Sequence, residues 1–349
     1  MKTRILLAAL ALMAVLAAVV VVGYTPEQDS LNGSILPLRW PTVSGQPTLT
    51  WQVNTSTGPN VDTSGGSVQS ALTAAFSAWT SAQVNLQTIS TLAVSEGPNG
   101  GPNDEDTTDC LNVVSFEPTS KTQFSTGVIA QTFVGWVTTP PPTSYTCSGG
   151  KQISVTVPLQ IVDADMVFST AACFSTGSPA PTPSCPQYYD VQSIATHEAG
   201  HMLGLDHSGI AHAVMYPFGD AGTSQQKVPA TDDRVGMAFL YPCTSISPPC
   251  TETFAAATGT VSGTVTLTGK GAFASHVVLL DSPTGIAVMD GLTHPDGTFQ
   301  LVGAPQGNYN LIALPLAGVY TLENFSLWAM PYPCNTSSCN PVDYTGTFH

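Results

Sequence analysis

The stretch HEAGHMLGLDH, residues 197–207, is the part of the sequence around which the other features can be arranged. His197 and His201 are four residues apart, so on an α-helix they share one face, about one turn from each other. Two imidazoles at this spacing can hold one zinc ion, and Glu198 between them can act on water at the metal. Gly204 lies where a helix can end in a left-handed turn, which can return His207 to the same ion. Three protein ligands leave a fourth position open, which is typical of catalytic zinc.

The histidines of the chain are concentrated here, because three of the 7 lie in this stretch. The pattern predicts an enzyme that hydrolyses peptide bonds, in which Glu198 takes a proton from water and passes it to the leaving amine. Gly200 fits either close packing near the metal or plain space filling on the helix. Asp206 could orient a histidine or cap the turn at the end of the helix, and the sequence does not choose between these roles.

Further residues give the stretch a family resemblance. The pattern His-Glu-x-x-His-x-x-Gly-x-x-His with a methionine downstream, Met215, resembles the metzincin clan of zinc peptidases. It is most similar to the matrixin branch, on the evidence of Ser208, the run VMYP at 214–217, Arg39-Trp40-Pro41, Trp51, Ala75-Phe76, Trp79 and Asp163-Ala164-Asp165. The resemblance covers about residues 36–242. It implies that His197, His201 and His207 hold one catalytic Zn²⁺, that Glu198 is the base and that Met215 lies beneath the metal.

The resemblance also implies an α+β fold in which a twisted, mostly parallel sheet is accompanied by three helices. A protein or peptide substrate would pair with the edge strand of this sheet, which we place at residues 160–168. We therefore expect substrate contacts at Ile161, Val162, Asp163, Ala164, Tyr216 and Pro217. The loop 218–230 is expected to form the specificity pocket.

The sequence departs from the animal matrixins in two respects. Its first cysteine is Cys110, so the pro-segment cysteine that blocks the zinc in those enzymes has no counterpart. No histidine precedes His197, which excludes a second, structural zinc in the form known there. Ca²⁺ stays open, because Asp163 and Asp165 share a strand face and could either ligate a cation at a strand edge or face water. The acidic loop 96–109 leaves the same two alternatives open.

Composition narrows the class of partner and the compartment. The formal net charge is −15 with only 8 Lys plus Arg, so nucleic acid is not expected as a partner. The apolar run 5–22 after Lys2 and Arg4 predicts a secretory signal over residues 1–23, with an uncleaved membrane anchor as the alternative, so we expect a secreted or periplasmic protein. The 8 cysteines predict disulfides, and the nearest candidates are Cys173–Cys185, Cys243–Cys250 and Cys334–Cys339.

Hydrophobic periodicity supplies the local structure. It predicts helices at 67–81, 189–203 and 231–241, the last two capped by Asp190 and Thr231. Alternating or β-branched runs predict strands at 49–53, 113–117, 127–137, 152–158 and 160–169.

After residue 258 the sequence changes character. Short strands at 260–266, 276–280, 299–302 and 308–313, separated by turn signals, predict a small β-sandwich that is similar to carboxypeptidase regulatory-like domains. We therefore divide the chain into a signal segment 1–23, a peptidase domain 24–245, a linker 246–257 and a sandwich with a cysteine-containing tail, 258–349. The alternative function is a non-catalytic extracellular binding protein that contacts a cell surface or polysaccharide through the sandwich. We expect a monomer.

Overall fold

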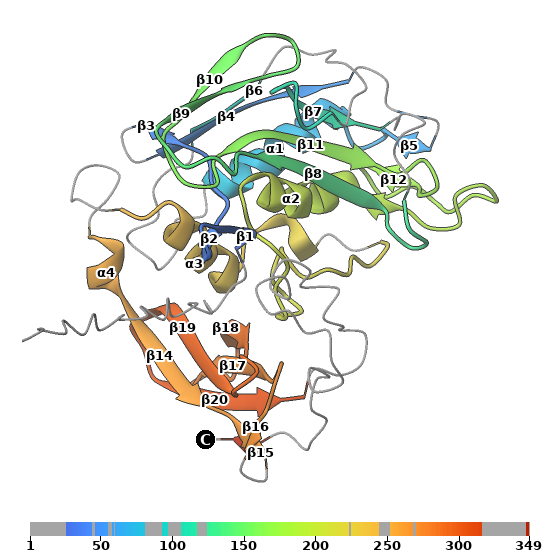
Figure 1. The fold of residues 1–349 in the computed structure, drawn as a ribbon. Coiled ribbons are helices and arrows are strands. Elements are labelled where there is room, and N and C mark those ends of the chain that lie inside the picture. Colours follow the sequence, from blue (N-terminus) through green and yellow to red (C-terminus); the bar gives the residue numbers. More distant parts are fainter. Residues whose placement is uncertain are drawn as a thin grey trace, which may run out of the picture.

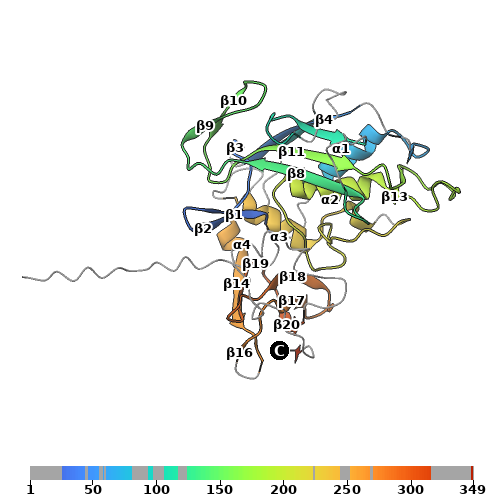
Figure 2. The same ribbon diagram turned by 45° about the vertical axis from the view of Figure 1, so that its right-hand side comes forward.

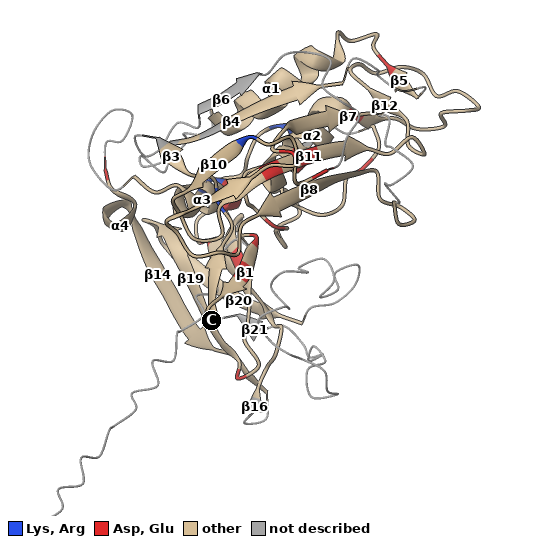
Figure 3. Cartoon of the chain, turned by 45° about the horizontal axis from the view of Figure 1, so that its top comes forward, with Lys and Arg blue, Asp and Glu red and all other residues tan. Residues whose placement is uncertain are grey.

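The computed structural model describes residues 26–43, 46–54, 58, 60–80, 93–96, 106–116, 124–222, 225–243, 252–267, 270–315 and 347–348. They form an α+β lobe built on one mixed sheet and a smaller lobe of antiparallel strands (Figure 1). Charged side chains are sparse along the described chain (Figure 3). The predicted signal segment lies outside the described residues, and none of the helices within them is long and apolar enough to cross a membrane.

The central sheet confirms the expectation of a mostly parallel arrangement. Its strands run in the order β3, β4, β7, β11, β8, with β6 also paired to β4. The pairs β4–β6, β4–β7 and β7–β11 are parallel, while β3–β4 and β11–β8 are antiparallel. The bounds are β3 Thr42–Val43, β4 Gln46–Val53, β6 Ala93–Glu96, β7 Asn112–Ser115, β8 Ala130–Trp136 and β11 Ile161–Phe168.

Strand β11 is an interior strand, so its predicted place at the edge of the sheet is wrong. It pairs with β7 on one side and with β8 on the other, and all eight of its residues are buried. The outer strand on this side is β8, which has no further strand beside it in the described part of the chain. Edge position depends on pairing between distant segments, which the strand's own sequence does not encode.

The α+β lobe also contains smaller sheets. Two antiparallel hairpins pair β1 with β2 and β9 with β10, and a parallel sheet joins β5, β12 and β13. Their bounds are β1 Gln28–Leu31, β2 Ser34–Pro37, β5 Val61–Asp62, β9 Thr143–Thr146, β10 Gln152–Val155, β12 Phe174–Ser175 and β13 Tyr189–Asp190.

Three helices accompany the sheet as expected: α1 (Val68–Thr80), α2 (Val191–Met202) and α3 (Thr231–Leu240). The apolar face of α1 is buried, and Phe76 stacks on Trp51 of β4 with ring centroids 4.5 Å apart. The indole N–H of Trp79 donates to the Thr196 carbonyl of α2 at 2.8 Å, which ties the two helices together. A short 3₁₀ turn, η1, spans Gln225–Lys227.

The N-terminus of α3 differs from the prediction. The N-cap is Ala230 and not Thr231, and its backbone N–H donates to the Asp233 carboxylate at 2.6 Å. The cap is therefore supplied from inside the first turn, because alanine has no side-chain acceptor of its own.

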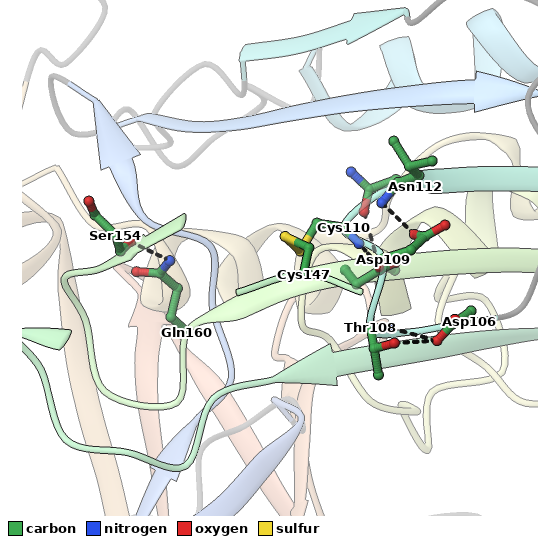
Figure 4. The surroundings of a disulfide bond; sticks show 11 residues. Asp106, Thr108, Asp109, Cys110, Asn112, Cys147, Ser154 and Gln160 are labelled. Atoms are coloured by element: carbon green, nitrogen blue, oxygen red, sulfur yellow. Dashed lines mark hydrogen bonds between the residues drawn. A yellow bond between two sulfur atoms is a disulfide. The ribbon is translucent and has the colours of Figure 1, made fainter. Parts of the chain in front are cut away.

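Two disulfides occur in the described residues. Cys173–Cys185 confirms the prediction from short spacing, whereas Cys110–Cys147, whose cysteines are 37 positions apart, was not among the predicted pairs. The bond between Cys110 and Cys147 joins the chain just before β7 to the residue that follows β9 (Figure 4). Cys250, Cys334 and Cys339 lie outside the described residues, so the other two predicted pairs stay predictions.

The C-terminal lobe, residues 252–315 with 347–348, contains two main antiparallel sheets. One pairs β14 with β19, and the other runs β18, β17, β20, β21, while β15 and β16 form a small hairpin. The elements are α4 Phe254–Ala257, β14 Thr258–Thr264, β15 Thr266–Leu267, β16 Lys270–Gly271, β17 His276–Asp281, β18 Ala287–Leu292, β19 Thr298–Pro305, β20 Tyr309–Leu314 and β21 Thr347–Phe348. The sheets are observed, and the sandwich itself stays a prediction, as do the domain boundaries.

The apolar core of this lobe is shared with α3. Val235 and Ala238 of α3 are fully buried in one cluster with Val277, Met289 and Leu301 of the C-terminal strands. Both ribbon views place α3 between α2 and the strands β18 and β19 (Figures 1 and 2). The predicted linker contains helix α4. Phe254 of this helix packs edge-on against Phe239 of α3, with the ring centroids 6.5 Å apart.

Candidate active site

Helix α2 carries the first half of the site. Asp190 is its N-cap as predicted, and its carboxylate accepts the Ser193 backbone N–H at 2.8 Å. One turn of helix separates His197 from His201, and their Nε2 atoms lie 3.2 Å apart. Glu198 is buried beside them with 5% of its surface exposed.

A turn at Gly204 carries the second half. Gly204 has φ +95°, and a side chain there would also collide with the Leu38 carbonyl, 2.6 Å from the position of a Cβ. Its N–H donates to the His201 carbonyl, and that of Leu205 donates to the Gly200 carbonyl, which closes the helix as expected. His207 then lies with its ring centroid 5.3 Å from that of His197 and 4.8 Å from that of His201.

The donor set fits a metal ion. One ring nitrogen of each of the three histidines lies within 4.8 Å of those of the other two. The Nδ1 atoms of His197 and His201 are each 2.7 Å from a carbonyl oxygen, of Val214 and Leu205 respectively. A carbonyl only accepts, so each Nδ1 carries the proton and each Nε2 presents a lone pair. Two lone pairs at 3.2 Å repel each other unless a cation lies between them, and ~3.3 Å is the spacing expected for two nitrogens on a tetrahedral zinc.

Burial sets the protonation of these groups. It lowers the pKa of His197 to about 3 and that of His201 well below its ordinary value, in both cases helped by the nearby His207. Neutral imidazoles are the form that binds a metal. Burial also raises the pKa of Glu198 to about 7, and the Thr132 hydroxyl, which donates to Glu198 Oε2 at 2.8 Å, partly offsets this rise.

Comparison with known proteins finds a family match for the part of the chain that contains this site. Residues 129–242 match the family model of the matrixins. The chain carries a matrixin-like metzincin catalytic domain. Among its relatives, metalloendoproteinase 2-MMP of Arabidopsis thaliana is 35% identical over 105 residues, 28% of this chain and 27% of the relative.

Other relatives match over shorter stretches, with a higher percentage of identical residues. Metalloendoproteinase 1-MMP of Arabidopsis thaliana is 51% identical over 53 residues, 15% of this chain and 14% of the relative. Matrilysin of Rattus norvegicus is 44% identical over 48 residues, 14% of this chain and 18% of the relative. The chain thus spans about a quarter or less of the length of these relatives, and the C-terminal lobe lies outside the family match. A matrixin-like domain implies zinc, for which the three histidines are the candidate ligands.

Met215 lies against α2, the helix that carries the histidines, and its place beneath the metal stays a prediction. A Cβ at Gly200 would lie 2.2 Å from the Met215 sulfur and 2.9 Å from Trp79, so this glycine permits a close approach and is not a plain space filler. The backbone N–H groups of Val214 and Met215 both donate to the Asp233 carboxylate, at 2.8 and 3.0 Å.

Asp206 contacts His207 in two ways. Its carboxylate accepts the backbone N–H of His207 at 2.7 Å and lies 3.8 Å from His207 Nδ1. The two roles considered for Asp206, orienting a histidine and capping the turn, both stay predictions.

The predicted substrate residues fall into two groups. Ile161, Val162, Asp163 and Ala164 lie in the interior strand β11, whose backbone groups are used by β7 and β8, so they cannot pair with a peptide as expected. Tyr216 and Pro217 follow Met215 directly, and the Tyr216 carbonyl accepts the side-chain amide of Gln226 at 2.9 Å. Gln226 belongs to the predicted specificity loop, of which residues 223–224 lie outside the description.

The two aspartates considered for calcium have another role. Asp163 and Asp165 are almost fully buried, so neither lies at a strand edge or faces water. Asp163 accepts the Cys110 backbone N–H and Asp165 that of Val113 at 2.8 Å, which joins β11 to the start of β7. Within the described residues, only the three histidines form a group suited to a metal. Residues 97–105 of the acidic loop are not described.

Two side chains at the site were missed by sequence reasoning. Thr132 of β8 reaches Glu198, and Glu27 lies with Oε1 3.6 Å from His201 Nδ1. The Glu27 backbone N–H donates to the Gly204 carbonyl at 2.8 Å, so the N-terminal segment covers the end of α2. Neither residue belongs to a local motif, and each meets α2 through pairing of distant segments, so no sequence signal pointed to them.

Proposed function

We propose that the chain is a secreted zinc-dependent endopeptidase in which His197, His201 and His207 hold one Zn²⁺ and Glu198 is the general base. The observation that carries the proposal is the buried Glu198 carboxyl beside three convergent imidazoles within a matrixin-like domain. The two disulfides of the described residues support an oxidising compartment. Protein or peptide substrates follow from the peptidase family, and the accessory binding role of the C-terminal lobe and the monomeric state stay predictions.

Zinc, when bound, supplies a Lewis acid that polarises the scissile carbonyl and makes water more acidic. Side chains of the protein transfer the protons and hold the reacting groups in position. Glu198 takes a proton from the attacking water and delivers it to the nitrogen of the leaving amine, so the carboxylate is regenerated in each cycle. The Thr132 hydroxyl holds the Glu198 carboxyl in place through its 2.8 Å bond to Oε2.

The substrate is aligned by the sheet. The edge strand β8 carries Thr132 and has a free side among the described strands, so an extended peptide can add to it as a further strand. This assigns to β8 the role that the sequence had suggested for residues 160–168. Binding there would bring the peptide past Glu198, because Thr132 connects the strand to that residue.

Substitution of Glu198 tests the mechanism. Glu198→Gln keeps the shape of the side chain and the three histidines but has no base, so we expect full zinc content and a fall in kcat of about 10²–10⁴-fold. Cleavage of a peptide library by the full chain, with zinc quantified in the same sample, measures both effects. Glu252→Gln is the matched control, because Glu252 lies in the C-terminal lobe. Undiminished cleavage by Glu198→Gln would exclude Glu198 as the base.

A further inference from the structure

The loop that follows His207 is held by the C-terminal lobe. The backbone N–H of Gly209 donates to Asp290 Oδ2 of β18 at 2.9 Å. The Nε2 atom of His276, on the neighbouring strand β17, lies 2.5 Å from the same oxygen. One carboxylate oxygen thus receives a backbone donor from the catalytic lobe and an imidazole from the C-terminal lobe.

This contact is buried and closely fitted. The side chains of Asp290 and His276 are 5% and 12% exposed. A buried carboxylate is costly unless it accepts strong hydrogen bonds, and both donors meet that need. Gly209 leaves no room for a side chain, because a Cβ would lie 2.2 Å from Asp290 Oδ2 and 2.5 Å from His276 Nε2. The close approach of loop and sheet therefore depends on glycine at this position.

Helix α3 also contacts both the C-terminal lobe and the loop of the catalytic lobe. Its Val235 and Ala238 complete the apolar core of the C-terminal strands, while its Asp233 holds Val214 and Met215 at the other end of the loop. Asp232 of the same helix is buried close to Asp290, and burial followed by the charge of Asp290 raises the pKa of Asp232. The C-terminal strands cannot leave the catalytic lobe without exposing this apolar surface to water.

We propose that Asp290 and His276 are positioning residues for His207, so that the C-terminal lobe forms part of the scaffold of the active site. The inference rests on the proposed role of His207 as a metal ligand. His207 is the one member of the three that no helix holds, and Gly209 lies two residues beyond it. Fixing Gly209 limits the positions that His207 can adopt and so keeps the third imidazole close to the other two.

Point variants of the full chain test this inference. Asp290→Ala removes the shared acceptor, and we expect zinc affinity, measured by competition with a chelator, to fall by about 10–100-fold, as for other supports of metal ligands. The visible absorption of the cobalt-substituted protein should change as well, because it reports the geometry around the metal. Asp290→Asn keeps an oxygen that can accept both donors and should restore most of the affinity and the spectrum. Gly209→Ala disturbs the contact from the loop side and should reproduce the loss.

Asp296→Ala is the matched control, because Asp296 lies in the same lobe and accepts from Thr298 in its own turn, at 2.9 and 2.6 Å. Equal losses in Asp290→Ala and Asp296→Ala would show a general destabilisation and overturn the inference. Unchanged affinity and cobalt spectrum in Asp290→Ala, or in Gly209→Ala if the first variant does not fold, would overturn it too. Failure of the proposed function is separate, since it would appear as wild-type protein that neither binds zinc nor cleaves peptides.

Discussion

The two halves of the site reach the same point by different means. His197 and His201 lie on one face of α2, and the helix alone sets their separation. His207 lies on a loop whose position depends on Gly204, on Asp233 and on Asp290 of the C-terminal lobe. The helix half can be deduced from spacing in the sequence, whereas the loop half depends on contacts between segments far apart. The two halves should therefore respond differently to substitution.

Removal of single ligands gives the largest effects. We expect His201→Ala and His207→Ala both to reduce cleavage to background and to weaken zinc by more than the roughly 10–100-fold typical of supporting residues. His207→Ala should retain the tighter zinc binding of the two, because the helix pair remains preorganised, whereas His201→Ala leaves one helix ligand and one loop ligand. Chelator competition measures this order, with His294→Ala as the control. Equal losses would show that the helix offers no advantage.

Asp233 tests the loop half without touching a ligand. Asp233→Ala leaves the N–H groups of Val214, Met215 and Ala230 without their acceptor. At ~1 kcal/mol for each lost bond, we expect the free energy of unfolding to fall by about 3 kcal/mol. Urea denaturation measures the change, and Asp281→Ala, which affects a local turn with Thr284, serves as the control. A loss no greater than in the control would mean that the Met215 turn is held by other contacts.

Gly200 tests the helix half. In Gly200→Ala the added methyl group would overlap the Met215 sulfur and press on Trp79, so we expect a loss of about 1–3 kcal/mol in unfolding free energy. Combining it with Met215→Ala removes the overlap and should recover part of that loss in a double-mutant cycle. Additive effects of the two substitutions would show that the glycine and the methionine do not interact.

The successes of sequence reasoning are local. The limits of α1, the Asp190 cap, the Gly204 turn and the convergence of the histidines all follow from periodicity and the chemistry of helix ends. Each of these features is decided within a few residues of chain, where backbone geometry leaves few alternatives.

Apart from the N-cap of α3, which is a local error, the errors concern pairing between distant segments. Residues 161–168 read as a good strand, but whether a strand lies inside a sheet or at its edge depends on partners up to 50 or so residues away, such as Val114 for Met166. The same holds for the bond between Gly209 and Asp290, which are 81 positions apart. Cys110–Cys147 belongs here too, because eight cysteines allow ~105 pairings and spacing favours only the short ones.

The sheet beneath both halves contains a group that should make stability depend on pH. Burial, followed by the charge of Asp165, raises the pKa of Asp163 to about 9, against about 3.9 in an unfolded chain. The folded state therefore binds an additional proton between these values, and the free energy of unfolding falls as pH rises through this window. Asp163→Asn can still accept the Cys110 N–H but has no proton to lose. We expect a smaller fall from about pH 5 to about pH 8 in this variant than in the wild type.

Urea denaturation in the presence of a chelator measures both proteins without a contribution from zinc. Asp62→Asn is the control: hydrogen bonds from Ser175 and Ser64 lower the pKa of Asp62, so it titrates below this window and its loss should leave the pH dependence unchanged. Identical pH dependence in the wild type and Asp163→Asn would mean that Asp163 is ionised throughout the window. Its bond to Cys110 would then outweigh burial, and the β7–β11 junction would be held by a carboxylate at neutral pH.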